Sequence, residues 1–182
     1  MPVFEVGTAC KCVCSCFTDD TLIRLADGQD IRAKDLLEGQ RVSTIGSTSG
    51  AVIWRVIKSS VKSLPLKSVA FSDGTSIAVS SNHVFISSDH RILRADKLKS
   101  GDKVLDGVLG AKIVNEISGT DYTGNLYNVV ISNSSAAPYD HLIITNGILS
   151  GDFSLQATND RDGRDIDLFL ANISVIKFDS EE

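Results

Sequence analysis

The stretch "IRAKDLLEGQRV" (31–42) returns in altered form, and without a gap, as "LRADKLKSGDKV" (93–104). Arginine, alanine, leucine, glycine and valine coincide in the two copies. Similar segments at a fixed spacing indicate that one structural unit is used more than once. The sequence therefore predicts an internal duplication.

Further pairs of segments follow in the same order and at nearly the same offset along the chain. They are 51–57 with 111–117, 66–72 with 126–132, and 83–86 with 141–144. The offset of the first pair makes Thr21 correspond to His83, and the offset of the last pair makes His83 correspond to His141. We expect two halves related by a pseudo-twofold axis, with both histidines in equivalent places beside one shared cleft.

The repeated segments are typical of an all-β protein. They are short and rich in valine, isoleucine and leucine, and turn-forming stretches such as "ADG", "SDG" and "KSGD" separate them. We expect a single helical turn within 31–38 and another within 93–99, and no long amphipathic helix.

The composition indicates one globular domain with tails. The chain has 182 residues, of which 42% are hydrophobic and 23% are charged. A net charge of −5 and the absence of a Lys/Arg stripe argue against a nucleic-acid partner. No apolar stretch reaches the roughly 18 residues that a membrane span needs, and no signal peptide is evident. We expect a monomer; the location stays open, with the cytoplasm favoured.

The four cysteines lie together in "CKCVCSC" (10–16). No disulfide framework can therefore cross-link the rest of the chain. Alternate spacing places these side chains on one face of an extended segment, which could bind zinc or copper through Cys10, Cys12 and Cys14. In the other interpretation Cys16 is a nucleophile that acts with the two histidines in acyl transfer. The residues alone also allow His83 and His141 to be ordinary strand residues.

Four segments in this order resemble the motifs of Hint domains, the module shared by inteins, bacterial intein-like domains and Hedgehog processing regions. They are "CFTDDTLIRLADGQDIRAKDLLEGQRV" (16–42), "SSNH" (80–83), "LYNVV" (126–130) and "HLIITNGILSGD" (141–152). The resemblance implies a β-horseshoe built by duplication. It also implies that the chain processes itself once, with its own flanking polypeptide as the substrate and without a cofactor.

The resemblance assigns roles to individual residues. Cys16 would attack the carbonyl of Ser15 and convert the amide bond into a thioester. His83 would protonate the leaving nitrogen, Ser80 would donate or accept hydrogen bonds at the reacting group, and His141 would be a second proton shuttle. Water, a thiol or an amine would then release the thioester.

Departures from the motifs limit the reaction. Inteins usually have aspartate where Asn128 stands, and an amide cannot take up a proton. They end in His-Asn followed by Cys, Ser or Thr, whereas this chain has Gly151, Asp152 and Phe153. We therefore expect N-terminal cleavage without splicing, and at best slow C-terminal cleavage through Asp152.

The expected organisation is a cysteine-rich flank (1–15), a Hint domain (16–152) and a C-terminal extension (153–182). The extension is expected to add one strand at 166–178 and an acidic tail. Asp160, Asp162 and Asp165 lack the rest of a calcium-binding loop and indicate a solvated turn.

Three functions stay open at this stage. The first is a self-cleaving domain, and the second is a non-catalytic β-domain with a metal-binding tail. The third is a Hint relic on a structural or toxin-associated protein. A redox control of the first function also follows from the sequence, because oxidation of Cys14 with Cys16 would block the nucleophile.

Overall fold

A computed structural model describes residues 16–45, 47–132 and 141–156. Almost all of its regular structure is strand, which confirms the predicted all-β class. The strands are β1 (Phe17–Thr18), β2 (Leu22–Arg24), β3 (Asp30–Arg32), β4 (Arg41–Val42), β5 (Ala51–Phe71), β6 (Ser76–Val79), β7 (Val84–Ile86), β8 (Ile92–Arg94), β9 (Lys103–Leu105), β10 (Ala111–Ser132), β11 (Leu142–Thr145) and β12 (Ile148–Gly151). The 3₁₀ helix η1 (Ala33–Asp35) and a helical turn at 153–156 complete these elements. Within the described residues, no helix has the length and apolarity needed to span a membrane.

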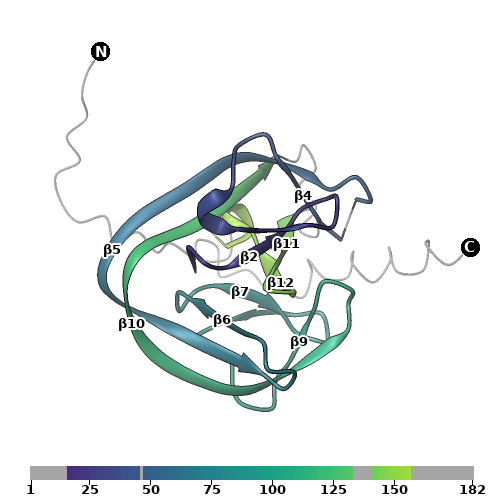
Figure 1. The fold of residues 1–182 in the computed structure, drawn as a ribbon. Helices are drawn as coiled ribbons and strands as arrows, with labels where there is room; N and C mark the ends of the chain where they lie inside the picture. The colour runs from purple at the N-terminus through teal and green to yellow at the C-terminus, as the bar shows by residue number, and fades with distance from the viewer. Residues whose placement is uncertain (1–15, 46, 133–140, 157–182) are drawn as a thin grey trace, which may run out of the picture.

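Two long curved strands, β5 and β10, form the outer arm of the horseshoe (Figure 1). They pair antiparallel from Val114↔Phe71 to Ser132↔Val52, with three shifts in register. Such irregularities bend a strand, so the pair can wrap around the smaller strands. The expectation of separate short segments at 51–57 and 66–72 is therefore wrong, because both belong to β5. Pro65 is tolerated there because this part of β5 pairs on one side with β10 and lacks a second neighbour among the described strands.

The two sheets have a symmetric strand order. One runs β4-β5-β6-β1-β10-β9 and the other runs β3-β2-β11-β12-β7-β8. In the second sheet β2 and β3 of the first half mirror β7 and β8 of the second half. The β11–β12 hairpin lies between them and joins the two halves. It turns at Asn146 and Gly147, both with positive φ (48° and 79°), as a two-residue hairpin turn requires.

Equivalent backbone hydrogen bonds confirm the duplication. The amide of Ala33 donates to the carbonyl of Thr21, and at the matching place in the second half the amide of Ala95 donates to the carbonyl of His83, both at 2.8 Å. The isolated bridge Leu25↔Val42 likewise returns as Ser87↔Val104. Thr21 and His83 therefore occupy equivalent places, as the offset of the first repeated pair predicts.

The predicted equivalence of His83 and His141 is wrong. His83 precedes β7, whose counterpart in the first half is β2, whereas His141 precedes β11, which pairs with both β2 and β12. The two segments resemble each other because both β7 and β11 are completely buried. Of the two predicted helical turns, the first is η1, and the second is only a hydrogen-bonded turn at 95–97.

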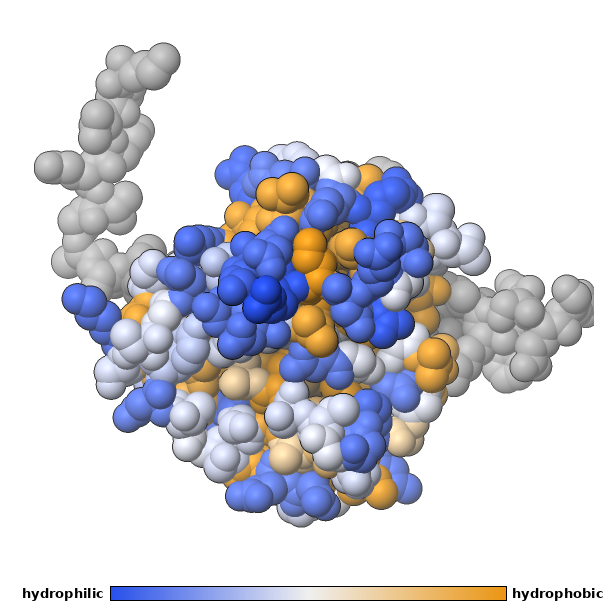
Figure 2. Space-filling view, in the orientation of Figure 1, coloured by the Kyte–Doolittle hydropathy of each residue, from blue (hydrophilic) through white to orange (hydrophobic). Residues whose placement is uncertain are grey.

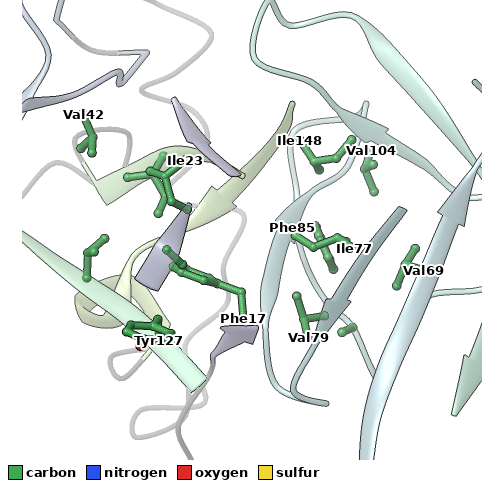
Figure 3. Close-up of a cluster of buried hydrophobic side chains, with 14 of the residues drawn as sticks. Phe17, Ile23, Val42, Val69, Ile77, Val79, Phe85, Val104, Tyr127 and Ile148 are labelled. Carbon is green, nitrogen blue, oxygen red and sulfur yellow. The ribbon is translucent and has the colours of Figure 1, made fainter. Parts of the chain in front are cut away.

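The core is built from matching positions of the two halves. Val42 and Val104 are both fully buried, and so are Val69 and Val129. Figure 3 shows side chains of this core gathering with Phe17, Ile23 and Phe85 between the sheets. Hydrophilic residues cover most of the face shown in Figure 2, with smaller apolar groups between them. Burying the same strand faces twice is what makes the repeat visible in the sequence.

The folded unit continues beyond the predicted boundary at 152. Residues 153–156 form a helical turn, and Leu155 and Gln156 are buried. The predicted strand at 166–178, the acidic tail and the turn at 159–165 lie outside the described residues. So do Cys10, Cys12, Cys14 and Ser15.

The turn at His90 gives a stability prediction. His90 has a φ of 63°, and its counterpart in the first half is Gly28 with a φ of 87°. Left-handed backbone is costly for a residue with a Cβ atom, so we expect His90→Gly to raise the free energy of unfolding by about 0.5–1 kcal/mol. Urea unfolding measures the change. His90→Ala is the control for losing the imidazole, and greater stability of His90→Ala than of His90→Gly would contradict the prediction.

Candidate active site

Cys16 lies at the start of β1, inside the horseshoe. β1 pairs with β10 through Phe17↔Tyr127 and with β6 through Phe17↔Val79. Continuing these registers by one residue brings Asn128 and Ser80 to either side of Cys16. Cys16 is fully buried and packs against Leu66 and Leu126.

Ser80 binds the backbone of Cys16 twice. The backbone amide of Cys16 donates to Ser80 Oγ over 2.7 Å, and the backbone amide of Ser80 donates to the carbonyl of Cys16 over 2.9 Å. The first of these contacts involves the nitrogen of the Ser15–Cys16 peptide bond itself. Ser80 Oγ in turn donates to Asn82 Oδ1 over 3.0 Å. A side chain is therefore already bound to the atom that would leave in cleavage.

His83 follows in the same tight turn, because its amide donates to the carbonyl of Ser80 over 3.0 Å. Its ring is fully buried and makes edge contacts with Phe17 and Phe85, with ring centroids 6.2 and 4.9 Å away. Burial among these groups lowers the pKa of His83 to about 3. His83 is therefore neutral at physiological pH.

The two ring nitrogens of His83 have different surroundings. Nε2 lies 3.2 Å from Ser150 Oγ. Within the described part of the chain, Nδ1 is the buried side-chain nitrogen or oxygen without a hydrogen-bond partner. A buried polar atom without a partner costs about 1–3 kcal/mol, so its presence calls for an explanation and marks a candidate reacting group.

The buried histidine predicts a loss of stability in acid. Below pH 6.5 the unfolded chain protonates His83, whereas the folded chain keeps it neutral down to a pKa of about 3. The free energy of unfolding should therefore fall by about 1.4 kcal/mol per pH unit as the pH drops below 6.5. Urea unfolding at pH 6.5 and pH 5 measures this slope. A His83→Asn chain should lose this contribution, and equal slopes in both chains would contradict the assignment.

A second polar group surrounds Asp152, which is fully buried. Its Oδ2 atom lies 3.0 Å from His141 Nδ1 and accepts the amide of Ile131, while Oδ1 accepts the amide of Leu155. Nearby, Asn128 Nδ2 donates to Gln156 Oε1 over 2.9 Å. The side-chain amide of Gln156 donates to the carbonyl of Gly151, which ties this group to the end of β12.

The predicted site residues thus fall into two neighbouring groups. Cys16, Ser80 and His83 form the first, and Asn128, His141 and Asp152 form the second. β12 connects them, because Ser150 contacts His83 and Asp152 contacts His141. Within the described ranges, no three His, Cys, Asp or Glu side chains come together as a metal-binding group.

Sequence reasoning missed four residues that hold these groups. They are Asn82, Thr145, Ser150 and Gln156. Asn82 lies inside the quoted "SSNH" motif, and Ser150 and Thr145 are polar residues within otherwise apolar buried strands, which was the available signal. Nothing local marks Gln156.

Solved structures of inteins share this architecture. The bacterial intein-like domain from Clostridium thermocellum has a TM-score of 0.66 and 19% identity, over 76% of this chain and 99% of its own. A DnaB intein from Synechocystis gives 0.63 and 19%, over 76% and 99%. The gp41-1 intein gives 0.62 and 19%, over 76% and 98%. The chain has the Hint fold.

No protein-family model matches the chain, and no curated protein does. The match to the Hint fold nevertheless extends over nearly the full length of the three intein structures. At this level of identity the likeness establishes the fold, and the reaction has to be argued from the site.

Proposed function

We propose that the domain cleaves its own chain at the Ser15–Cys16 bond, by an N-to-S acyl shift followed by release of the thioester. The observation that carries this proposal is the hydrogen bond from the backbone amide of Cys16 to Ser80 Oγ. It places a polar side chain on the nitrogen of that bond. The buried and unpartnered Nδ1 atom of His83, further along the same turn, supports it.

His83 carries one proton from the thiol of Cys16 to the leaving nitrogen in this reaction. The Cys16 sulfur attacks the Ser15 carbonyl carbon, and its proton passes to His83 Nδ1. As the carbon–nitrogen bond breaks, that proton moves to the nitrogen of Cys16, which becomes an amine. A neutral imidazole is suited to the first transfer, and the imidazolium formed in a buried site is a strong acid for the second. Water, a thiol or an amine then takes the acyl group.

The contacts of Asp152 support the proposal that the chain is not cleaved at its C-terminal side and keeps the residues after 152. Its carboxylate accepts the amides of Ile131 and Leu155 and lies against His141, so it is held away from attack on its own carbonyl. Gly151 and Phe153 offer neither a histidine nor a nucleophile. We therefore propose single-turnover N-terminal cleavage without splicing.

Intact mass after incubation with a small thiol tests the proposal. The parent chain should release residues 1–15 as a thioester, whereas Cys16→Ala should stay whole. Cys14→Ser is the matched control, since it removes a cysteine of the flank and should leave cleavage intact. Cleavage of Cys16→Ala at the parent rate would exclude the mechanism.

The metal-binding alternative calls for a separate measurement. Zinc or copper would bind through Cys10, Cys12 and Cys14, which lie outside the described residues. Metal content that is the same after all three are changed to serine would count against it.

A further inference from the structure

We propose that Ser150 and Thr145 are positioning residues of this reaction, because their hydroxyls hold the hydrogen on His83 Nε2 and leave Nδ1 as the nitrogen that accepts a proton. The inference rests on the proposed cleavage and adds two residues to it. Both lie in the β11–β12 hairpin, far from His83 in the sequence.

The three side chains form one buried row. His83 Nε2 lies 3.2 Å from Ser150 Oγ, which lies 2.6 Å from Thr145 Oγ1. All three residues are 0% exposed. The row is therefore shielded from bulk water, and Ser150 Oγ is the hydrogen-bond partner of Nε2.

A neutral imidazole carries one hydrogen, so the partner of Nε2 decides the state of Nδ1. If Nε2–H donates to Ser150 and Ser150 donates to Thr145, Nδ1 keeps its lone pair. The opposite order would place a hydrogen on Nδ1, where a buried donor has no acceptor and no further proton can be taken up. Only the first order lets His83 begin as a base.

The same order also serves the second half of the reaction. After Nδ1 takes the thiol proton, both ring nitrogens carry hydrogen, and Nε2 keeps donating to Ser150. When Nδ1 passes its proton to the leaving nitrogen, the ring returns to its first state. Neither hydroxyl loses a proton. Ser150 is uncharged, so it does not stabilise the imidazolium of His83 as a carboxylate would. The imidazolium therefore remains a strong acid.

Nitrogen-15 NMR of the Cys16→Ala chain tests this assignment without any cleavage. We expect His83 to be protonated at Nε2. Adding Ser150→Ala should move a measurable share of the hydrogen to Nδ1, and adding Thr145→Val should do so to a smaller extent. Ser87→Ala is the matched control, since it removes a buried hydroxyl with hydrogen bonds in the β7–β8 turn and should change nothing at His83.

Cleavage rates in the Cys16 chain provide the second measurement. Ser150→Ala should slow thiol-induced release by about tenfold or more, a part of the about 10²- to 10⁴-fold that a general acid–base contributes. Thr145→Val should slow it less, and Thr145→Ser, which keeps the hydroxyl, should restore the parent rate.

Two results would overturn the inference. One is a His83 ring protonated at Nδ1 in the Cys16→Ala chain, and the other is an unchanged hydrogen position after Ser150→Ala. An uncleaved Cys16 chain with the expected NMR signals would overturn the proposed cleavage instead, and would leave the assignment of the hydrogen standing.

Discussion

A chain in which His83 is replaced by glutamine should release its N-terminal segment about 10²- to 10⁴-fold more slowly than the parent. The glutamine side chain can still reach a hydrogen-bond partner such as Ser150, but it has no nitrogen that takes up a proton. The thiol proton then has no carrier to the leaving amide. A time course of intact mass in the presence of thiol measures the rate.

His90→Gln is the matched control, since the same substitution is made at a histidine in the β7–β8 turn. We expect its cleavage rate to stay within about twofold of the parent. Urea unfolding of both variants separates lost chemistry from lost folding. A folded His83→Gln chain that cleaves at the parent rate would remove His83 from the mechanism.

The duplication could be predicted because matched positions meet the same physical demand. Val42 and Val104 enter one core from equivalent strands, so both have to be apolar and β-branched. The long strand β5 could not be predicted as a single element. Its middle part has one strand neighbour among the described residues and is largely exposed, so it lacks the apolar alternation that identifies a strand.

The first group of site residues could be predicted from the sequence for a different reason. Cys16, Ser80 and His83 belong to compact motifs whose spacing reflects one turn next to one strand. The residues that hydrogen-bond the site residues from other parts of the chain could not be predicted in this way. Ser150, which contacts His83, is 67 positions away from it, and Gln156, which contacts Asn128, is 28 positions away. Such contacts depend on how the hairpin docks, which a single sequence does not reveal.

The false equivalence of His83 and His141 has a similar cause. β7 and β11 are both buried on both faces, and full burial selects the same apolar residues wherever the strand lies. The similar sequences of the two strands therefore reflect their full burial. The position of β11 in the sheet depends instead on its pairing with β2 and β12.

Replacing Asp152 by alanine should lower the free energy of unfolding by about 3–5 kcal/mol, because it leaves buried partners of a carboxylate without an acceptor. The amides of Ile131 and Leu155 would lose their acceptor, and His141 would lose its contact at 3.0 Å. Urea unfolding measures the change. Asp30→Ala is the control: Asp30 pairs with Arg24 at the surface, and such pairs contribute about 0–1 kcal/mol.

Asp152→Asn separates the structural role of this residue from a chemical one. The amide keeps the shape, but an NH₂ group replaces one carboxylate oxygen, so it can accept only one of the two backbone amides that now bind Oδ1 and Oδ2. We expect a loss of stability that is smaller than for alanine, which accepts neither. It also supplies the side chain that inteins use to cleave at their C-terminal end. Because residues 153–156 remain packed through Leu155 and Gln156, we expect no cleavage after position 152. A new C-terminal fragment in the mass spectrum would mean that the chemistry of residue 152, and not the packed turn behind it, keeps the flank attached.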